Sequence, residues 1–272
     1  MTKLILKNAL MLFAILSIFS LPAIAGGKVS FGGDLDRPVS TKNADLKESG
    51  NGARDEEIPE EPEDEEPEDP PIFLDEEIPG HTIVLALDRS GSMSSQYNAG
   101  IPIYDMNGNV ISSPTRWQVV QSETAHLVGA MTEEHSFDLV TYATQVYTCF
   151  GELRAASPGA KAIAIGWIYS QGTTGCTNSY DALRAAFNNY GQVDTILFMS
   201  DGYPNTALSL GCGGCACSSW IGSRILTDAT AWISRQIAMF EGFTFLVMQM
   251  GGSPMAFMQQ LGAKPNSAFF LK

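Results

Sequence analysis

Basic residues and histidine are scarce in this sequence. Of its 272 residues, 16 are Lys or Arg and 3 are His, whereas 30 are Asp or Glu. Because contacts with phosphate groups need clustered Lys and Arg side chains, this composition argues against a nucleic acid partner. The histidines are scattered and pair with no evident nucleophile, so we expect none to act as a catalytic base. They are His81, His126 and His135.

Long apolar runs are also scarce, and cysteine is absent before Cys149. The apolar run at 9–21 is shorter than the roughly 20 residues that a membrane anchor would need. Two lysines precede the run, and Ala-Ile-Ala follows it, ending at Ala25. This order predicts a cleaved secretory signal peptide over residues 1–25, and no cysteine lies there for lipid attachment. We therefore expect a secreted, extracellular or periplasmic chain that does not span a membrane after cleavage.

Large apolar residues are few between residues 26 and 80. This stretch contains 18 acidic and 5 basic residues, a net charge of −13 out of −14 for the whole chain. Between Asp55 and Pro71 it is almost entirely Asp, Glu and Pro. Such a composition predicts a disordered, extended acidic linker, with an acidic tail for calcium or basic partners as the alternative. Residues 81–272 hold most of the apolar content and are expected to form one globular domain.

Short apolar runs alternate with helical periodicity in this globular part. The runs at 81–88, 193–199 and 243–250 are typical of strands buried on both faces. The segments between them place apolar residues at three- and four-residue intervals, as amphipathic helices do. A hairpin is expected between residues 137 and 150. The pattern predicts an α/β, Rossmann-like, doubly wound and mostly parallel sheet, with one antiparallel edge strand and helices on both faces.

Oxygen-bearing residues follow two of the predicted strands. Asp-Arg-Ser-Gly-Ser-Met occupies 88–93, and Ser-Asp-Gly-Tyr-Pro-Asn occupies 200–205. Between them, Gly-Cys-Thr-Asn-Ser-Tyr-Asp at 175–181 opens a helix. Alone, each segment is equally typical of a turn or a helix cap. Ligands of open parallel sheets bind outside the carboxyl ends of the strands, so we expect the strand-end groups at one edge of the sheet.

The order and spacing of these segments resemble the von Willebrand factor A family and its metal ion-dependent adhesion site. The matching elements are D-x-S-G-S-M at 88–93, G-x-T-N-x-Y-D-A-L at 175–183 and S-D-G-x-P-N at 200–205, and the resemblance covers residues 82–271. It implies the fold of that family and one bound divalent cation. The implied ligands, with the aspartates acting directly or through water, are Asp88, Ser90, Ser92, Thr177 and Asp201.

Hard oxygen donors of this kind suit magnesium. Mg²⁺ favours octahedral oxygen coordination with few carboxylates and retains water readily. Three neutral hydroxyls would leave the cation incompletely neutralised, so an Asp or Glu of a protein partner could complete its shell. We expect Mg²⁺, with Mn²⁺ or Ca²⁺ as alternatives. Thr173 and Thr174 are rival donors to Thr177, which the resemblance favours because it directly precedes the helix start.

The five cysteines all lie in the exported domain, where oxidation is allowed. Cys149 is the expected free thiol, because it sits near the end of the hairpin, away from the others. The remaining four are expected to form two disulfide bonds that clamp the binding face, in any of three pairings. A zinc site or a redox Cys-x-x-Cys pair is the rival interpretation. The four are Cys176, Cys212, Cys215 and Cys217.

Two long segments, 94–116 and 205–219, are expected on the binding face, where loops usually carry specificity. We hypothesise that the first of them selects the partner through Tyr97, Ile101, Ile103 and Tyr104.

The function expected from the sequence is binding rather than catalysis: an exported, metal-dependent protein-binding or adhesion module. One alternative is an accessory or assembly subunit of a secreted or periplasmic complex. Another is a metal-dependent hydrolase, against which stands the lack of a recognisable activated nucleophile or general base.

Overall fold

The computed structural model describes residues 70–98 and 100–272. The predicted signal peptide and most of the predicted linker lie outside the described residues. The strands are β1 (Ile72–Phe73), β2 (Glu76–Glu77), β3 (Thr82–Asp88), β4 (Ser136–Tyr142), β5 (Val146–Thr148), β6 (Arg154–Ala155), β7 (Thr195–Ser200), β8 (Thr244–Gln249) and β9 (Ser267–Leu271). The helices are η1 (Gly91–Ser94), α1 (Arg116–Ala130), α2 (Pro158–Ser170), α3 (Ser179–Asn188), η2 (Leu208–Leu210), α4 (Ser218–Met239) and α5 (Ala256–Gly262).

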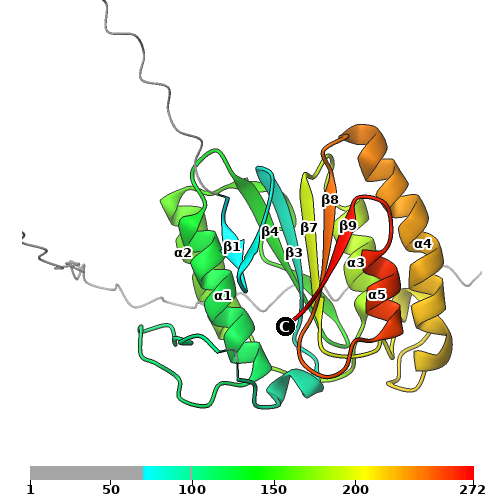
Figure 1. Cartoon of the computed structure of the whole chain (residues 1–272), viewed down its shortest axis with the longest axis horizontal. Coiled ribbons are helices and arrows are strands. Elements are labelled where there is room, and N and C mark those ends of the chain that lie inside the picture. The colour runs from blue at the N-terminus through cyan, green and yellow to red at the C-terminus, as the bar shows by residue number, and fades with distance from the viewer. Residues whose placement is uncertain (1–69, 99) are drawn as a thin grey trace, which may run out of the picture. The chain divides into compact units, whose positions relative to one another are not determined.

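A seven-stranded sheet in the order β5-β4-β3-β7-β8-β9, with β6 also paired to β4, forms the centre of the domain (Figure 1). Five of the strands pair with one another in parallel, in the order β4, β3, β7, β8 and β9. The short strands β5 and β6 run antiparallel to β4. The structure therefore confirms the predicted α/β class, with a mostly parallel sheet and antiparallel pairing at one edge.

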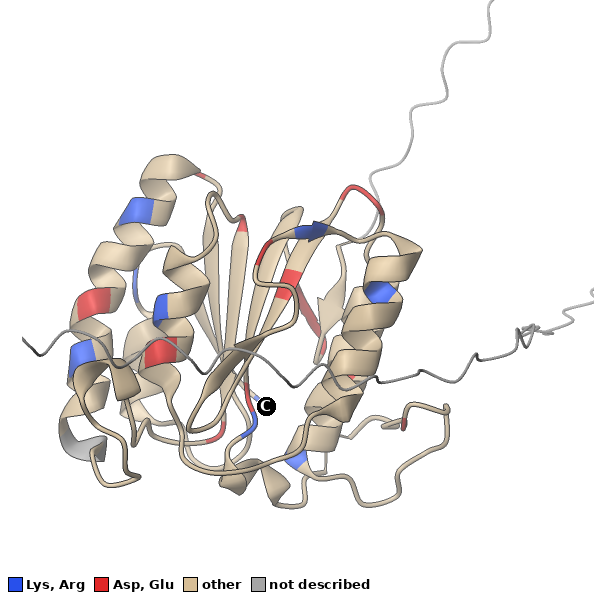
Figure 2. Cartoon of the chain, turned by 180° about the vertical axis from the view of Figure 1, so that it is seen from behind, with Lys and Arg blue, Asp and Glu red and all other residues tan. Residues whose placement is uncertain are grey.

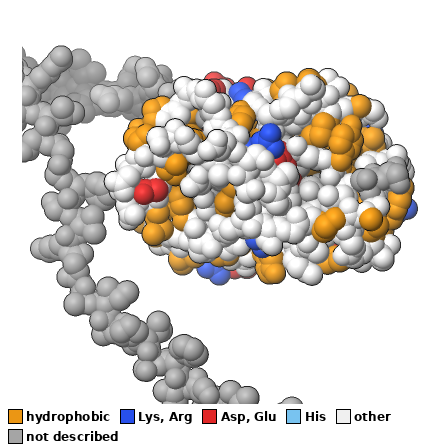
Figure 3. Space-filling model, turned by 90° about the horizontal axis from the view of Figure 1, so that it is seen from below, with side chains coloured by type: hydrophobic (Ala, Val, Ile, Leu, Met, Phe, Trp, Pro, Cys, Tyr) orange, Lys and Arg blue, Asp and Glu red, His pale blue; other side chains and the backbone are white. Residues whose placement is uncertain are grey.

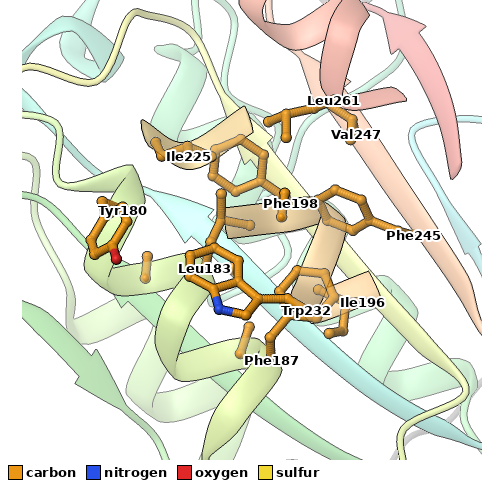
Figure 4. Close-up of a cluster of buried hydrophobic side chains, with 14 of the residues drawn as sticks. Tyr180, Leu183, Phe187, Ile196, Phe198, Ile225, Trp232, Phe245, Val247 and Leu261 are labelled. Carbon is orange, nitrogen blue, oxygen red and sulfur yellow. The ribbon is translucent and has the colours of Figure 1, made fainter. Parts of the chain in front are cut away.

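Helices cover both faces of this sheet, as Figure 1 shows, with α1 and α2 on one side and α3, α4 and α5 on the other. Alternate residues of β3 enter the two cores: Leu85 packs on the α1 and α2 side, and Val84 on the other. The second core is rich in aromatic rings (Figure 4). There, Phe187 of α3 lies 5.8 Å from the Trp232 ring and 5.2 Å from the Phe245 ring, measured between centroids. Burial on both faces explains the continuous apolar sequence of the strands.

The last ten residues of the predicted linker belong to the folded domain, so its predicted end at residue 80 is wrong. Strands β1 and β2 form a hairpin whose Phe73 is fully buried against the α1 side of the core, together with Leu74 and Ile78. The backbone N–H of Leu74 donates to the Glu123 carboxylate of α1 at 3.1 Å. Composition averaged over 55 residues conceals three apolar side chains that are enough to attach this hairpin.

Within residues 70–98 and 100–272, no helix combines the length and apolar character needed to cross a bilayer.

Replacing Phe73 tests how strongly the hairpin contributes to stability. Phe73→Ala should lower the free energy of unfolding by about 3–5 kcal/mol, because it removes a fully buried ring and leaves a cavity. Its neighbour Ile72 is 54% exposed, so Ile72→Ala should change stability by less than about 0.5 kcal/mol. Urea denaturation of both variants, with the disulfides intact, makes the comparison. Equal effects of the two substitutions would show that the hairpin is not part of the stable core.

Candidate functional site

The candidate site lies where the order of the strands reverses. From β3 the chain continues through α1 to β4 on one side, and from β7 it continues through α4 to β8 on the other. Leu87 pairs with Met199, so the next residues, Asp88 and Ser200, end the two strands at the same level. Parallel sheets bind ligands at such a switch point. Figure 3 shows this end of the molecule, with a small basic area beside a small acidic one near the centre of the face.

Asp88 lies at the buried bottom of the site. Its side chain is inaccessible to solvent, and its two oxygens accept hydrogen bonds from the Ser90 backbone N–H at 2.7 Å and from Ser200 Oγ at 2.5 Å. The pKa of Asp88 is raised to about 7, because the effects of burial and of the nearby Asp201 carboxylate outweigh the lowering by the hydrogen bonds from Ser200 and Ser90. A carboxylate in this position is one that a bound cation would stabilise in its charged form.

Ser90 and Ser92 connect Asp88 to Asp201, first through the Ser90 backbone N–H and then through the two serine hydroxyls. Ser90 Oγ lies 3.2 Å from Ser92 Oγ, and Ser92 Oγ donates to Asp201 Oδ1 at 2.7 Å. Ser90 is buried, whereas Ser92 is exposed. Because Met93 is fully buried in the core, the η1 turn, which contains Ser92 and directly follows Ser90, is anchored to the core. The set therefore has a buried side and an open side.

The segment that carries Thr177 is fastened to both strand ends. Gly91 N–H donates to the Gly175 carbonyl at 3.1 Å, and Thr177 N–H donates to Asn205 Oδ1 at 2.8 Å. Gly175 has a φ of 61°, and a side chain there would collide with Thr144, so the turn requires glycine. Thr177 itself is buried. The structure thus brings all three predicted segments together, and it adds Asn205, to which the motif alone assigned no role.

Arg116 is a residue of this site that the sequence analysis missed. Its Nη1 lies 2.6 Å from Asp201 Oδ2, and the Asp201 side chain is fully shielded from solvent. The sequence signal that could have identified Arg116 is its position at the start of a helix. Arg116 directly follows Thr115, whose side chain caps α1 by accepting from the Gln118 N–H. A cation in the first turn of a helix opposes the helix dipole, so this placement indicates an anionic partner elsewhere.

No protein-family model matches this sequence, and no curated protein matches it either. Solved structures with a similar arrangement include a von Willebrand factor type A protein from Catenulispora acidiphila, at 14% identity and a TM-score of 0.46 over 70% of this chain and 38% of that one. Another is proximal thread matrix protein 1 of the mussel byssus, with a zinc-occupied adhesion motif, at 17% identity and a TM-score of 0.45 over 70% and 40% of the two chains.

A further similar structure is the PilB minor pilin of Streptococcus sanguinis, at 18% identity and a TM-score of 0.43, over 73% of this chain and 58% of the pilin. The chain thus spans about two fifths of the length of the first two proteins and under two thirds of the pilin. At these identities the similarity concerns the fold alone, and the function has to be argued from the site.

The donor set suits a hard divalent cation. In the described part of the chain, no three side chains among His, Cys, Asp and Glu come together to hold a metal. The candidate site instead groups the Asp88 and Asp201 carboxylates with the hydroxyls of Ser90 and Ser92, which lie between them. Charged carboxylate oxygens together with neutral hydroxyl oxygens are suitable ligands for Mg²⁺, Mn²⁺ and Ca²⁺.

Two disulfide bonds clamp the face, and the four cysteines involved are those that the sequence indicated. Cys176 is bonded to Cys215, and Cys212 to Cys217. The first bond ties the residue before Thr177 to the loop that follows Asp201. Because Cys212 and Cys215 are each bonded to another cysteine, the rival zinc or redox Cys-x-x-Cys interpretation does not hold for this structure.

One of the four residues that we hypothesised to select the partner is buried in the core. Ile103 is 1% exposed and packs in the core with α1, so it anchors its loop and cannot contact a partner. The adjacent Tyr104 is half-buried, and its carbonyl accepts a hydrogen bond from the Tyr169 hydroxyl at 3.1 Å. Tyr97 and Ile101 are also half-buried. In contrast, Tyr203, two residues after Asp201, is 49% exposed, although the sequence pattern does not single it out.

Cys149, the free cysteine, should react slowly in the native protein. Burial and, to a smaller extent, the nearby Asp138 carboxylate together raise the pKa of its thiol to about 12. At neutral pH the thiolate fraction should be roughly a thousandfold below that of an ordinary cysteine. We expect negligible labelling by Ellman's reagent in buffer and one equivalent per chain in denaturant without reductant. Rapid native labelling, or more than one equivalent after unfolding, would contradict the assignment.

Proposed function

We propose that this face binds one divalent cation, and that the bound cation receives a carboxylate from a protein partner. One observation carries the proposal: the carboxylates of Asp88 and Asp201 are brought together across the ends of β3 and β7 by hydrogen bonds through Ser90 and Ser92. The Ser90 backbone N–H donates to Asp88, the two serine hydroxyls bond each other, and Ser92 Oγ donates to Asp201. The proposed ligands are Asp88, Ser90, Ser92, Thr177 and Asp201.

Charge balance supports an anionic partner. The set contains two carboxylates, and Arg116 already pairs with one of them, that of Asp201. The hydroxyls of Ser90 and Ser92 are neutral. A divalent cation held here would keep excess positive charge, and the exposed Ser92 lies on its open side. Magnesium, which retains water ligands readily, would exchange one of them for a carboxylate oxygen of Asp or Glu.

The positions of the histidines support binding rather than catalysis. His81 and His135 directly precede β3 and β4, so they lie at the opposite end of the parallel strands from Asp88. Their rings lie 5.2 Å apart, measured between centroids. His126 of α1 lies against Tyr104. None of the three lies at the carboxyl ends of the strands beside Asp88, where a hydrolase would need a general base.

Export is part of the proposal and rests on two features. The disulfide bonds Cys176–Cys215 and Cys212–Cys217 are typical of oxidising compartments. The predicted signal peptide, outside the described residues, indicates the same destination. The partner would therefore be met in the periplasm or outside the cell.

Removal of one exposed hydroxyl tests the metal site. Ser92→Ala should weaken Mg²⁺ binding at least tenfold, roughly the range known for supporting groups of metal sites. Ser95→Ala is the matched control, because Ser95 is also exposed and its hydroxyl lies outside the oxygen set. Isothermal titration calorimetry of the wild type and both variants measures the effect. Unchanged affinity in Ser92→Ala, or no stoichiometric Mg²⁺ binding by the wild type, would refute the site.

A small carboxylate tests the recognition step without a known partner. In the presence of Mg²⁺, acetate should shift the backbone amide NMR signals of Ser92 and Gly202, which flank the proposed cation. Acetamide has nearly the same shape but no charge, so it should leave these signals unchanged. Chelation of the metal should abolish the acetate effect. Equal shifts with acetamide, or with acetate after chelation, would count against a metal-bound carboxylate.

A further inference from the structure

Arg116 brings a permanent positive charge into the proposed cation site. Its Nη1 lies 2.6 Å from Asp201 Oδ2, and the two side chains are 22% and 0% exposed. The other basic residues are spread over several helices, a short strand and loops (Figure 2). Both oxygens of Asp201 are therefore engaged, Oδ1 by the Ser92 hydroxyl and Oδ2 by Arg116.

The backbone around Arg116 holds the side chain in this position. Its N–H donates to the Ser95 carbonyl at 2.9 Å, which ties the start of α1 to the turn that carries the serines. On the other side, Gly251 lies against the guanidinium, and a side chain at that glycine would meet Arg116 Nη2 at 3.1 Å. Arg116 Nε is buried without a hydrogen-bond partner. The guanidinium is thus confined beside Asp201 although the helix dipole opposes it there.

We infer that Arg116 is a built-in counter-ion of the site. It neutralises Asp201 when no metal is bound, and it lowers the affinity for a divalent cation by repulsion. This inference rests on the proposed function, because it assumes that the oxygen set binds metal. The physical basis is that a buried carboxylate without a cation is strongly unfavourable, whereas two cations beside the same carboxylate repel each other. The same Asp201 carboxylate would thus face Arg116 alone in the metal-free form, and both Arg116 and the cation in the metal-bound form.

Arg116→Gln separates this role from simple positioning of Asp201. Glutamine can still donate a hydrogen bond to the carboxylate, but it carries no charge. We expect Arg116→Gln to bind Mg²⁺ at least about tenfold more tightly than the wild type, because the repulsion is lost. In the presence of EDTA its Tm should fall by roughly 5 °C or more, because Asp201 loses its counter-ion. Saturating Mg²⁺ should recover most of that loss.

Two controls accompany this variant. Arg116→Lys keeps the charge, so its Mg²⁺ affinity should stay near that of the wild type. Arg224→Gln removes an equal charge from an ion pair with Asp228 on α4, where the Arg224 side chain is 53% exposed. It should change neither the Mg²⁺ affinity nor the Tm in EDTA appreciably, because exposed ion pairs contribute little.

Calorimetry and thermal melts of these proteins distinguish the outcomes. If the wild type binds Mg²⁺ and Arg116→Gln binds it equally or more weakly, the counter-ion role is overturned while the metal site stands. If neither protein binds Mg²⁺, the proposed function fails and the inference fails with it. Tighter binding by Arg116→Gln, together with a Tm loss in EDTA that the Arg224 control lacks, supports the inference.

Discussion

The parallel pairing of β3 with β7 is the constraint on which the rest of the site depends. Its register sets Asp88 beside Ser200, with a hydrogen bond of 2.5 Å between them, and it brings Asp201 to the same edge. Both strands are buried on both faces, and β3 turns the larger Leu85 and the smaller Val84 toward different cores. A slip of one residue would exchange these faces, so packing of the whole domain fixes the position of the carboxylates.

Burial of negative charge follows from that geometry and shapes the chemistry of the face. Asp88 accepts hydrogen bonds from the neutral donors Ser90 and Ser200, whereas Asp201 has the guanidinium of Arg116. Buried charges need pairing or metal coordination. The two carboxylates are therefore unequal: one depends on neutral donors, and the other has a fixed cation. This asymmetry makes the oxygen set suited to a divalent ion whose charge is only partly cancelled.

The loops above the strand ends are held by covalent bonds and by core contacts. The bond between Cys176 and Cys215 joins the Thr177 segment to the loop after Asp201, and the Gly175 turn fits against Thr144. On the other side, Ile103 inserts into the core and fastens the long segment that precedes α1. These restraints limit how far the oxygen donors can move, which favours a preformed site over one assembled on binding.

The sequence by itself determined the α/β class, the two strand ends that carry carboxylates, and the oxygen residues of the three motifs, because strand burial and motif spacing are local properties. The tertiary structure decided the rest. The pairing of Cys176 with Cys215 joins residues 39 apart in sequence, and the contact of Arg116 with Asp201 joins residues 85 apart. Likewise, Phe73 and Ile103 look like isolated apolar residues until the core encloses them. Contacts between distant segments depend on how helices pack across the sheet, and no local pattern records that packing.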